Sequence, residues 1–200
     1  MHGKRVKKGQ NLRAKVCVLR NILKNLFRAP SFYAILKEKK KGGIAIKVCC
    51  FTGHRTLPTS GRLALVQTLD KTVEYLIGEG FTEFRAGGAL GFDMLAALRV
   101  LSAREKHPEI KLHLILPCRD QAKRWREGEQ LLWQDIVDRA DSVQFLYDTY
   151  KAGCMHARNR ALVDGSDLCI AYITRHEGGT FYTCSYAQQN GVPILNLAKK

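Results

Sequence analysis

Apolar residues follow two alternating patterns from residue 44 to the end of the chain. Continuous apolar runs of strand length occupy residues 46–52, 81–86, 110–116, 143–147, 168–173 and 192–197. Between these runs, apolar residues recur at three- and four-residue steps, as at positions 63, 66, 69, 73 and 76 and again at 131, 132, 136 and 137. This repeat is typical of a helix with one buried face. The chain is therefore predicted to alternate strands with helices.

Strands separated by single helices are predicted to lie parallel, because a parallel neighbour needs a crossover connection and a helix is the usual one. Right-handed crossovers then give an α/β fold, a Rossmann-like, doubly wound and mostly parallel six-stranded sheet with helices on both faces. We expect the strand order 3-2-1-4-5-6, with a crevice between the first and fourth strands. Ligands bind beyond the carboxyl ends of such strands, which indicates four loops: residues 53–55, 87–93, 148–158 and 174–180.

The positive charge of the chain lies almost entirely before the first predicted strand. The 200 residues carry a formal net charge of +15. Residues 1–43 hold 13 Lys/Arg and a single acid, Glu38, whereas residues 44–200 hold 20 Lys/Arg and 17 acids. The sequence thus predicts a basic N-terminal arm, residues 1–43, followed by a nearly charge-balanced domain, residues 44–200.

Three interpretations of the basic arm stay open. An apolar repeat at positions 12, 16, 19, 23 and 26 favours an amphipathic basic helix, which could bind an anionic membrane or nucleic acid. The same composition is typical of a disordered, solvated tail. Finally, Lys-Gly-Gly at residues 41–43 is what a purine-rich ribosome-binding site would encode if translated, so the native start could lie later. The function of the domain is therefore argued without the arm.

Composition also sets expectations about location, metals and cofactors. The seven cysteines form no C-x-x-C pair and no regular framework, which is typical of a reduced, cytoplasmic protein. The apolar runs are only of strand length, so we predict no transmembrane segment and no signal peptide. Histidines 54, 156 and 176 lie in separate loops without a carboxylate cluster, so no metal site is predicted. No motif indicates a bound cofactor.

Two glycine-rich turns each follow a predicted strand and open a helix. Helix N-terminal amides can bind a phosphate, and glycine allows its close approach. A tight turn or a helix cap would explain either turn alone, but two on one sheet edge favour a nucleotide-like ligand. The first turn is not G-x-G-x-x-G, so a dinucleotide fingerprint is not met. The candidate ligand-binding residues in these turns are Gly87, Gly88, Gly91, Gly178, Gly179 and Thr180.

Polar side chains beside these turns supply the remaining candidates. Arg158 could pair with a phosphate or a carboxylate through two hydrogen bonds, and Asn159 could bind a ribose or a base edge. A surface salt bridge and a backbone cap are the structural alternatives for these two residues. Thr52, Gly53, His54 and Arg55 end the first strand and would form the crevice floor, and Asp93 could be a ribose ligand or a helix cap.

Catalytic residues cannot be assigned from the pattern alone. Arg158, Asp93, Glu177 and His54 are weak candidates, and for His54 a structural hydrogen bond in the turn competes with catalysis. Trp125 follows the third strand and could stack on a nucleobase or pack against the next helix.

The motifs at the strand ends resemble those of a known family. Residues 51–55 (FTGHR), 87–93 (GGALGFD), 158–159 (RN) and 178–180 (GGT) look like the YpsA/YoqJ-like branch of the SLOG superfamily. This superfamily groups the DNA-processing protein DprA with the LOG nucleotide hydrolases. The resemblance covers about residues 46–197 and implies a Rossmann-like domain that binds nucleotides or nucleotide-derived ligands.

The resemblance also indicates where this chain departs from LOG hydrolases. Their Met-x-x-Arg helix is matched by Met155 and Arg158, but Thr183 stands where their catalytic glutamate would be. A carboxylate is the group that glycosidic cleavage needs.

Three hypotheses follow for the function. The leading one is binding of a nucleoside phosphate or an ADP-ribose or NAD-derived ligand for sensing or regulation. The alternatives are a LOG-like N-glycosidase or phosphoribohydrolase and a DprA-like nucleic-acid binder, and the sequence leaves oligomerisation open.

Overall fold

The structure, a computed structural model, describes residues 46–198. The predicted basic arm, residues 1–43, lies outside the described residues. The strands are β1 (Lys47–Gly53), β2 (Phe81–Ala86), β3 (Lys111–Cys118), β4 (Ser142–Tyr147), β5 (Leu168–Tyr172) and β6 (Ile194–Asn196). The helices are α3 (Arg62–Gly78), α4 (Phe92–Arg104), α5 (Glu127–Arg139), α6 (Cys154–Val163) and α7 (Gly178–Gln189).

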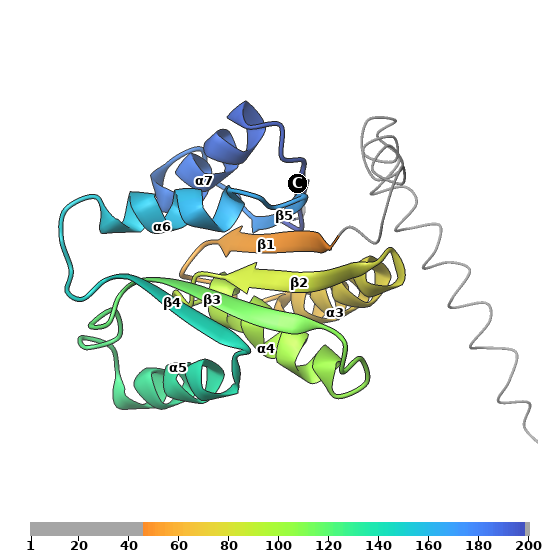
Figure 1. Cartoon of the computed structure of the whole chain (residues 1–200), viewed down its shortest axis with the longest axis horizontal. Coiled ribbons are helices and arrows are strands. Elements are labelled where there is room, and N and C mark those ends of the chain that lie inside the picture. The colour runs from red at the N-terminus through yellow and green to blue at the C-terminus, as the bar shows by residue number, and fades with distance from the viewer. Residues whose placement is uncertain (1–45, 199–200) are drawn as a thin grey trace, which may run out of the picture. The chain divides into compact units, whose positions relative to one another are not determined.

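The strands form one six-stranded sheet in which every pairing is parallel. Helices α3, α4 and α5 lie on one face of this sheet, and α6 and α7 lie on the other (Figure 1). The predicted Rossmann-like α/β fold with helices on both faces is therefore confirmed.

The predicted strand order was wrong in one respect. The observed order is β4-β3-β2-β1-β5-β6, so the fourth strand extends the first half of the sheet instead of starting the second. The chain makes three successive crossovers on one face through α3, α4 and α5. Helix α6 then returns it across the other face to β5, and α7 continues on that face to β6. The crevice at the reversal point consequently lies between β1 and β5.

The burial of β4 explains the error. Apolar periodicity predicts that two strands are joined by a crossover, but it does not say to which side the chain steps. Ser142 and Gln144 alternate with less exposed residues along β4, which is the pattern of an edge strand. Because β4 pairs only with β3, it closes one edge of the sheet, and the three-residue β6 closes the other.

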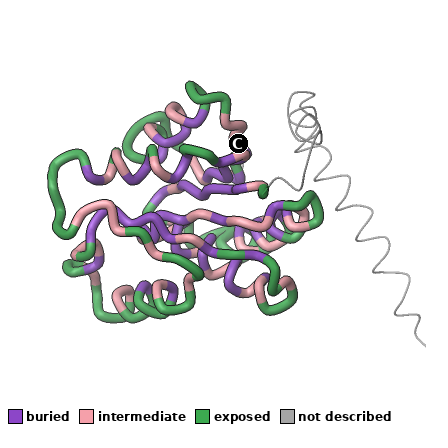
Figure 2. Tube along the Cα trace, viewed as in Figure 1, coloured by how far each residue is buried: buried purple, intermediate pink, exposed green. Residues whose placement is uncertain are grey.

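The core is built around the central strand β1. Its residues 48–52 are buried in an unbroken run, since β2 and β5 flank the strand and helices cover both faces (Figure 2). The Phe51 and Phe84 rings stack with centroids 6.1 Å apart and planes at 15°. The loop after β1, which carries part of the site, therefore starts from a buried strand.

The inward faces of two helices differ from the predicted ones. In α3 the buried stripe is Leu65, Leu69, Thr72, Val73 and Leu76, whereas Leu63 is 71% exposed. In α5 the run Leu131-Leu132-Trp133 presents only its third member to the core. Neighbouring apolar residues on a helix point about 100° apart, so the pattern could not decide which of them faces the sheet.

Residues 46–198 contain no helix that is long and apolar enough to cross a membrane. The same range contains no group of three or more His, Cys, Asp or Glu side chains that could hold a metal ion. Its six cysteines are free and buried.

Two leucines of α3 provide a matched test of this packing. Leu69→Ala should lower the free energy of unfolding by about 2–5 kcal/mol, because Leu69 is fully buried and its truncation leaves a cavity. Leu63→Ala, on the exposed side of the same helix, should change it by less than about 0.5 kcal/mol. Urea unfolding followed by circular dichroism measures both values, and similar losses in the two variants would contradict the observed orientation of α3.

Candidate functional site

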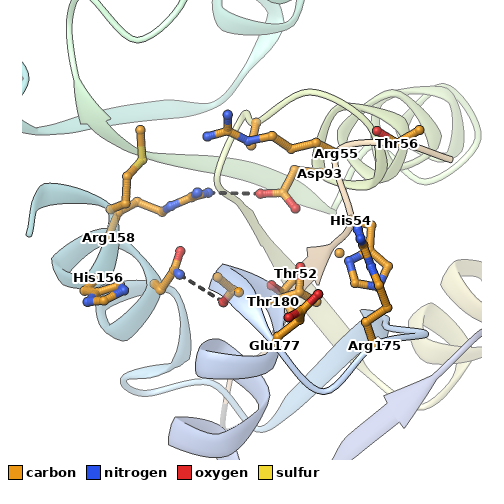
Figure 3. Close-up of a pocket in the computed structure, with 16 residues that line it drawn as sticks. Thr52, His54, Arg55, Thr56, Asp93, His156, Arg158, Arg175, Glu177 and Thr180 are labelled. Atoms are coloured by element: carbon orange, nitrogen blue, oxygen red, sulfur yellow. Dashed lines mark hydrogen bonds and ion pairs between the residues drawn. The ribbon is translucent and has the colours of Figure 1, made fainter.

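A pocket of about 580 Å³ opens at the carboxyl edge of the sheet, where β1 and β5 end as neighbours. Its walls come from the loops after β1 and β5 and from the first turns of α4, α6 and α7 (Figure 3). The lining residues are Thr52, Gly53, His54, Arg55, Thr56, Ala89, Asp93, Met155, His156, Arg158, Asn159, Arg175, Glu177, Gly178, Gly179 and Thr180. The predicted ligand residues Gly87, Gly88 and Gly91 are not among them.

A buried ion pair forms the back of the pocket. Nη1 of Arg158 in α6 lies 3.0 Å from Oδ2 of Asp93 in α4, and the two side chains are 8% and 5% exposed. Burial raises the pKa of Asp93, while the Arg158 guanidinium and the backbone amides of Ala89 and Gly87 act in the opposite direction. The pair joins a helix on one face of the sheet to a helix on the other.

The first glycine turn holds this ion pair. A Cβ on Gly87 would lie 1.4 Å from Nη1 of Arg158 and 2.7 Å from Oδ2 of Asp93, so no side chain fits at this position. The backbones of Gly87 and Ala89 lie close enough to the Asp93 carboxylate to lower its pKa against the effect of burial. The turn thus binds an anion, as its sequence suggested, but that anion is the protein's own carboxylate.

The other two glycines of this turn allow close packing behind the pocket. Gly91 has a φ of +86°, and its Cβ would lie 2.2 Å from the Arg55 carbonyl oxygen. Gly88 has a φ of +58°, and its Cβ would lie 2.7 Å from the Leu116 side chain. Both positions therefore need glycine for backbone conformation and for space.

Arg158 retains hydrogen-bonding capacity after pairing with Asp93. Its Nε is buried and has no hydrogen-bond partner among the described residues. Guanidinium groups donate in several directions of one plane, so one edge can meet Asp93 while another meets a second acceptor. An unpaired donor on a buried cation is costly.

The N-terminus of α7 forms the opposite wall. The N-cap residue Glu177 is extended and makes no side-chain capping hydrogen bond within residues 46–198, and Gly178 has a φ of +76°. The backbone of Gly178, Gly179 and Thr180 lines the pocket together with the buried Thr180 side chain. The positive end of the helix dipole and the uncapped amides therefore lie at the pocket, which favours an anion there.

Two hydrogen bonds fix this helix start against α6. The Gly179 carbonyl accepts from Nδ2 of Asn159 at 3.2 Å and from the hydroxyl of Thr183 at 2.8 Å. Asn159 therefore bonds backbone, as its structural alternative supposed, but that backbone belongs to another helix 20 residues away and is not local. Thr183 is fully buried, so the position at which the resemblance places the LOG glutamate holds a structural hydroxyl instead.

His54 connects the two loops at the reversal point. Its Nε2 accepts the Thr174 amide hydrogen at 2.9 Å, and its own backbone N–H donates to the Tyr172 carbonyl at 3.2 Å. Burial and the nearby Arg175 lower the pKa of His54. The imidazole is therefore held as a neutral acceptor, which fits the structural role considered for it.

Exposed side chains complete the rim. His156 stacks on Tyr182 with centroids 4.3 Å apart, and Glu177 is an exposed carboxylate of the lining. Sequence reasoning did not single out Thr56, Ala89 or Arg175. Arg175 could have been found, since it is a cation inside the loop 174–180 that leads to the glycine pair.

Cysteine chemistry is not favoured near the site. Cys118 ends β3 and is buried, and burial, with Asp120 close by, raises its pKa to about 12. Its thiol therefore stays protonated near neutral pH and is a poor nucleophile.

The fold and the pocket define a Rossmann-like α/β domain with a ligand-sized pocket at the reversal point of its sheet. The model of the YpsA SLOG family matches residues 59–192, and the chain belongs to this family. The resemblance of the strand-end motifs to the YpsA/YoqJ-like branch is thus confirmed.

Relatives of this family are found in bacilli. The chain is 30% identical to a UPF0398 protein of Brevibacillus brevis over 57% of this chain and 58% of that protein. It is 29% identical to the SPbeta prophage-derived protein YoqJ of Bacillus subtilis over 64% of this chain and 82% of that protein. A UPF0398 protein of Halalkalibacterium halodurans is 29% identical over 72% of this chain and 82% of that protein.

Solved structures of DNA processing protein A share the fold. The protein from Helicobacter pylori superposes with a TM-score of 0.54 at 19% identity over 80% of this chain and 66% of that one. The protein from Streptococcus pneumoniae gives the same TM-score at 16% identity over 76% of this chain and 50% of that one. The chain thus spans only half to two thirds of these two proteins.

Gly87→Ala tests the packing of the first glycine turn. The added Cβ should displace Arg158 from Asp93 and lower the free energy of unfolding by more than about 1 kcal/mol, since it combines overpacking with a broken buried pair. Gly179→Ala is the matched control, because its Cβ would meet nothing closer than Nδ2 of Asn159 at 3.6 Å. Denaturant unfolding of both variants measures the difference, and an unchanged Gly87→Ala protein would refute the arrangement.

The lowered pKa of His54 predicts a specific pH dependence of stability. An unfolded-state imidazole titrates near pH ~6.5, so below that pH the unfolded chain binds a proton more readily than the folded one. The contribution of His54 is therefore present above this pH and is lost as the pH falls through the lower folded pKa. His54→Gln keeps an acceptor but does not titrate. The melting temperature of the native protein should fall more than that of His54→Gln between pH 7 and 5, and parallel curves would exclude the assignment.

Proposed function

We propose that this pocket binds a nucleotide-like ligand through its phosphate, for sensing or regulation and not for hydrolysis. One observation carries the proposal: the uncapped N-terminus of α7 faces a pocket whose back wall is the buried Arg158, with an unpartnered Nε among the described residues. Helix amides and a guanidinium both favour a group with several anionic oxygens.

The size of the pocket supports this ligand class. Small-molecule sites commonly enclose about 300–1,000 Å³, and this pocket encloses about 580 Å³. A free phosphate would fill only a small part of that volume. The ligand therefore carries a larger group, and the Thr52 and Thr180 side chains offer hydroxyls for its polar atoms.

The charges of the lining favour the same class. Arg55, Arg158 and Arg175 supply three cations against Asp93 and Glu177, and Asp93 is already paired. The net field at the pocket is consequently positive although the domain as a whole is nearly balanced. A phosphate would supply the negative charge that balances this excess of cations.

The arrangement supports binding more than glycosidic cleavage. Asp93 is buried against Arg158, and Thr183 holds the position of the LOG glutamate. Glu177 is the exposed carboxylate of the lining, at the N-cap of α7, where no hydrogen bond or ion pair with another described residue orients it. Cleavage would need a carboxylate held against the scissile bond.

Nucleic acid is the second candidate ligand. The Helicobacter pylori DNA processing protein A, whose fold this chain shares, is described as binding single-stranded DNA. Exposed Arg55 and Arg175 at the rim could contact further phosphates of a strand. Both candidates share the phosphate contact with Arg158 and α7.

Arg158→Lys tests the proposal without removing the buried charge. The full chain should bind at least one of AMP, ADP-ribose and NAD by calorimetry, and Arg158→Lys should weaken that binding by about tenfold or more, since a charge-assisted hydrogen bond contributes about 1.5–3 kcal/mol. Inorganic phosphate should compete with the ligand. Arg160→Lys is the matched control, because Arg160 lies on the same helix, is exposed and bonds Tyr182 instead.

The same samples separate the alternatives. A labelled single-stranded oligonucleotide tests the nucleic-acid candidate, and chromatography of the mixtures detects any released base. Absence of binding to every probe, or equal affinity in the native protein and Arg158→Lys, would refute the proposal. Release of free base that Arg158→Lys abolishes would replace it with the hydrolase function.

A further inference from the structure

A second pocket adjoins the first on the same edge of the sheet. It encloses about 490 Å³ and lies where β3 ends, between the loop that follows β3 and the loop that leads to α6. Its wall includes Lys123, Arg124, Trp125 and Tyr150. Arg55 and Met155 line both pockets, so the two pockets are direct neighbours.

Arg55 stands at the junction of the two pockets. Its side chain extends along one edge of the first pocket, beside the Arg158–Asp93 pair (Figure 3). The residue is exposed, and its carbonyl packs against the Gly91 position, which fixes its backbone. A ligand that passes from one pocket to the other would meet this guanidinium.

The wall of the second pocket is held in place by hydrogen bonds. Nε2 of Gln130 donates to the Trp125 carbonyl at 2.9 Å, and Nε2 of Gln121 donates to the Gly88 carbonyl at 2.7 Å. The Tyr150 amide donates to Oδ1 of Asp120 at 3.0 Å. The backbone that carries both aromatic rings is therefore fixed before a ligand arrives, which lowers the entropy cost of binding.

The two aromatic rings offer surface for a flat group. Trp125 packs at 81° to Trp133 with centroids 6.4 Å apart, so its ring is braced from one side, and it is only half-buried. Tyr150 is 62% exposed. Aromatic side chains of this kind stack on nucleobases with little preference for the base.

The charge of the second pocket also favours a nucleotide-like group. Arg55, Lys123 and Arg124 face one acid of the lining, Asp120, whose carboxylate already accepts the Tyr150 amide hydrogen. Cations interleaved with aromatic rings favour a group that is both anionic and planar.

We propose that the second pocket is a subsite for the second ring-bearing unit of a dinucleotide-type ligand, whose first phosphate lies in the first pocket against Arg158 and α7. This inference rests on the proposed function. The first pocket alone is large enough for a mononucleotide, so a second, cationic and aromatic pocket joined to it serves a longer molecule. Arg55 contacts the phosphate that links the two units, and Trp125 stacks on the second ring.

The test compares a probe with one ring-bearing nucleotide unit, called the one-ring probe, with probes that carry two such units, called the two-ring probes. Calorimetry on the full chain uses AMP, NAD and the 5′-phosphorylated dinucleotide of deoxyadenosine. The last two distinguish a diphosphate-linked ligand from a phosphodiester-linked one. At least one two-ring probe should bind about tenfold more tightly than AMP.

Trp125→Ala should remove this advantage and leave the affinity for AMP within about twofold of the native value. Phe181→Ala is the matched control, since Phe181 is an aromatic residue that is 38% exposed and lines neither pocket. Lys123→Gln combined with Arg124→Gln changes only exposed side chains, and should also weaken the two-ring probe selectively. This second variant decides the question if Trp125→Ala fails to fold.

The outcomes separate the two proposals. If AMP binds as tightly as both two-ring probes, or if the variants weaken all probes equally or none, the second subsite is refuted while phosphate binding in the first pocket stands. If no probe binds, the proposed function fails and the subsite fails with it.

Discussion

The buried pair between Arg158 and Asp93 is the interaction on which the site depends. It crosses the carboxyl edge of the sheet and ties α6, on one face, to α4, on the other. Removing two charges from water is costly, and the attraction between them repays that cost only when the remaining donors and acceptors are also satisfied. Asp93 meets this condition through the Gly87 and Ala89 amides, whereas Arg158 keeps a buried Nε without a partner among the described residues.

This difference between Asp93 and Arg158 connects the fold to the proposed function. The first glycine turn packs against the protein's own Asp93 carboxylate. In the proposed binding mode the phosphate of the ligand therefore meets the second glycine turn, at the start of α7. Asn159 and Thr183 hold the Gly179 carbonyl and thereby keep that helix start in position. Thr183, at the position where LOG hydrolases carry their catalytic glutamate, is thus a buried structural hydroxyl, which supports the proposal of binding without hydrolysis.

Much of the site could be predicted because its residues follow the carboxyl ends of strands. Loops at the carboxyl ends of parallel strands meet at one edge whichever way the sheet is ordered, so Thr52 to Arg55, Arg158 and the Gly178 turn were expected together and do line one pocket. The strand order itself was wrong because periodicity does not encode the side to which a crossover steps. Leu63 and Leu131 were predicted to face the core but are exposed. Successive residues of a helix point about 100° apart, so the apolar pattern does not show which of two neighbouring apolar residues faces the sheet.

The sequence by itself determined the alternation of strands and helices, the parallel Rossmann-like sheet, the edge that carries the loops and the family, because these follow from local periodicity and from short motifs. Only the tertiary structure decided that the anion of the Gly87 turn is Asp93, that His54 is a neutral acceptor for Thr174, and that Arg55 joins two pockets. The physical reason is that a polar side chain takes its role from the partner it meets. Asp93 and Arg158 are 65 residues apart in the chain, and only folding brings their side chains into contact.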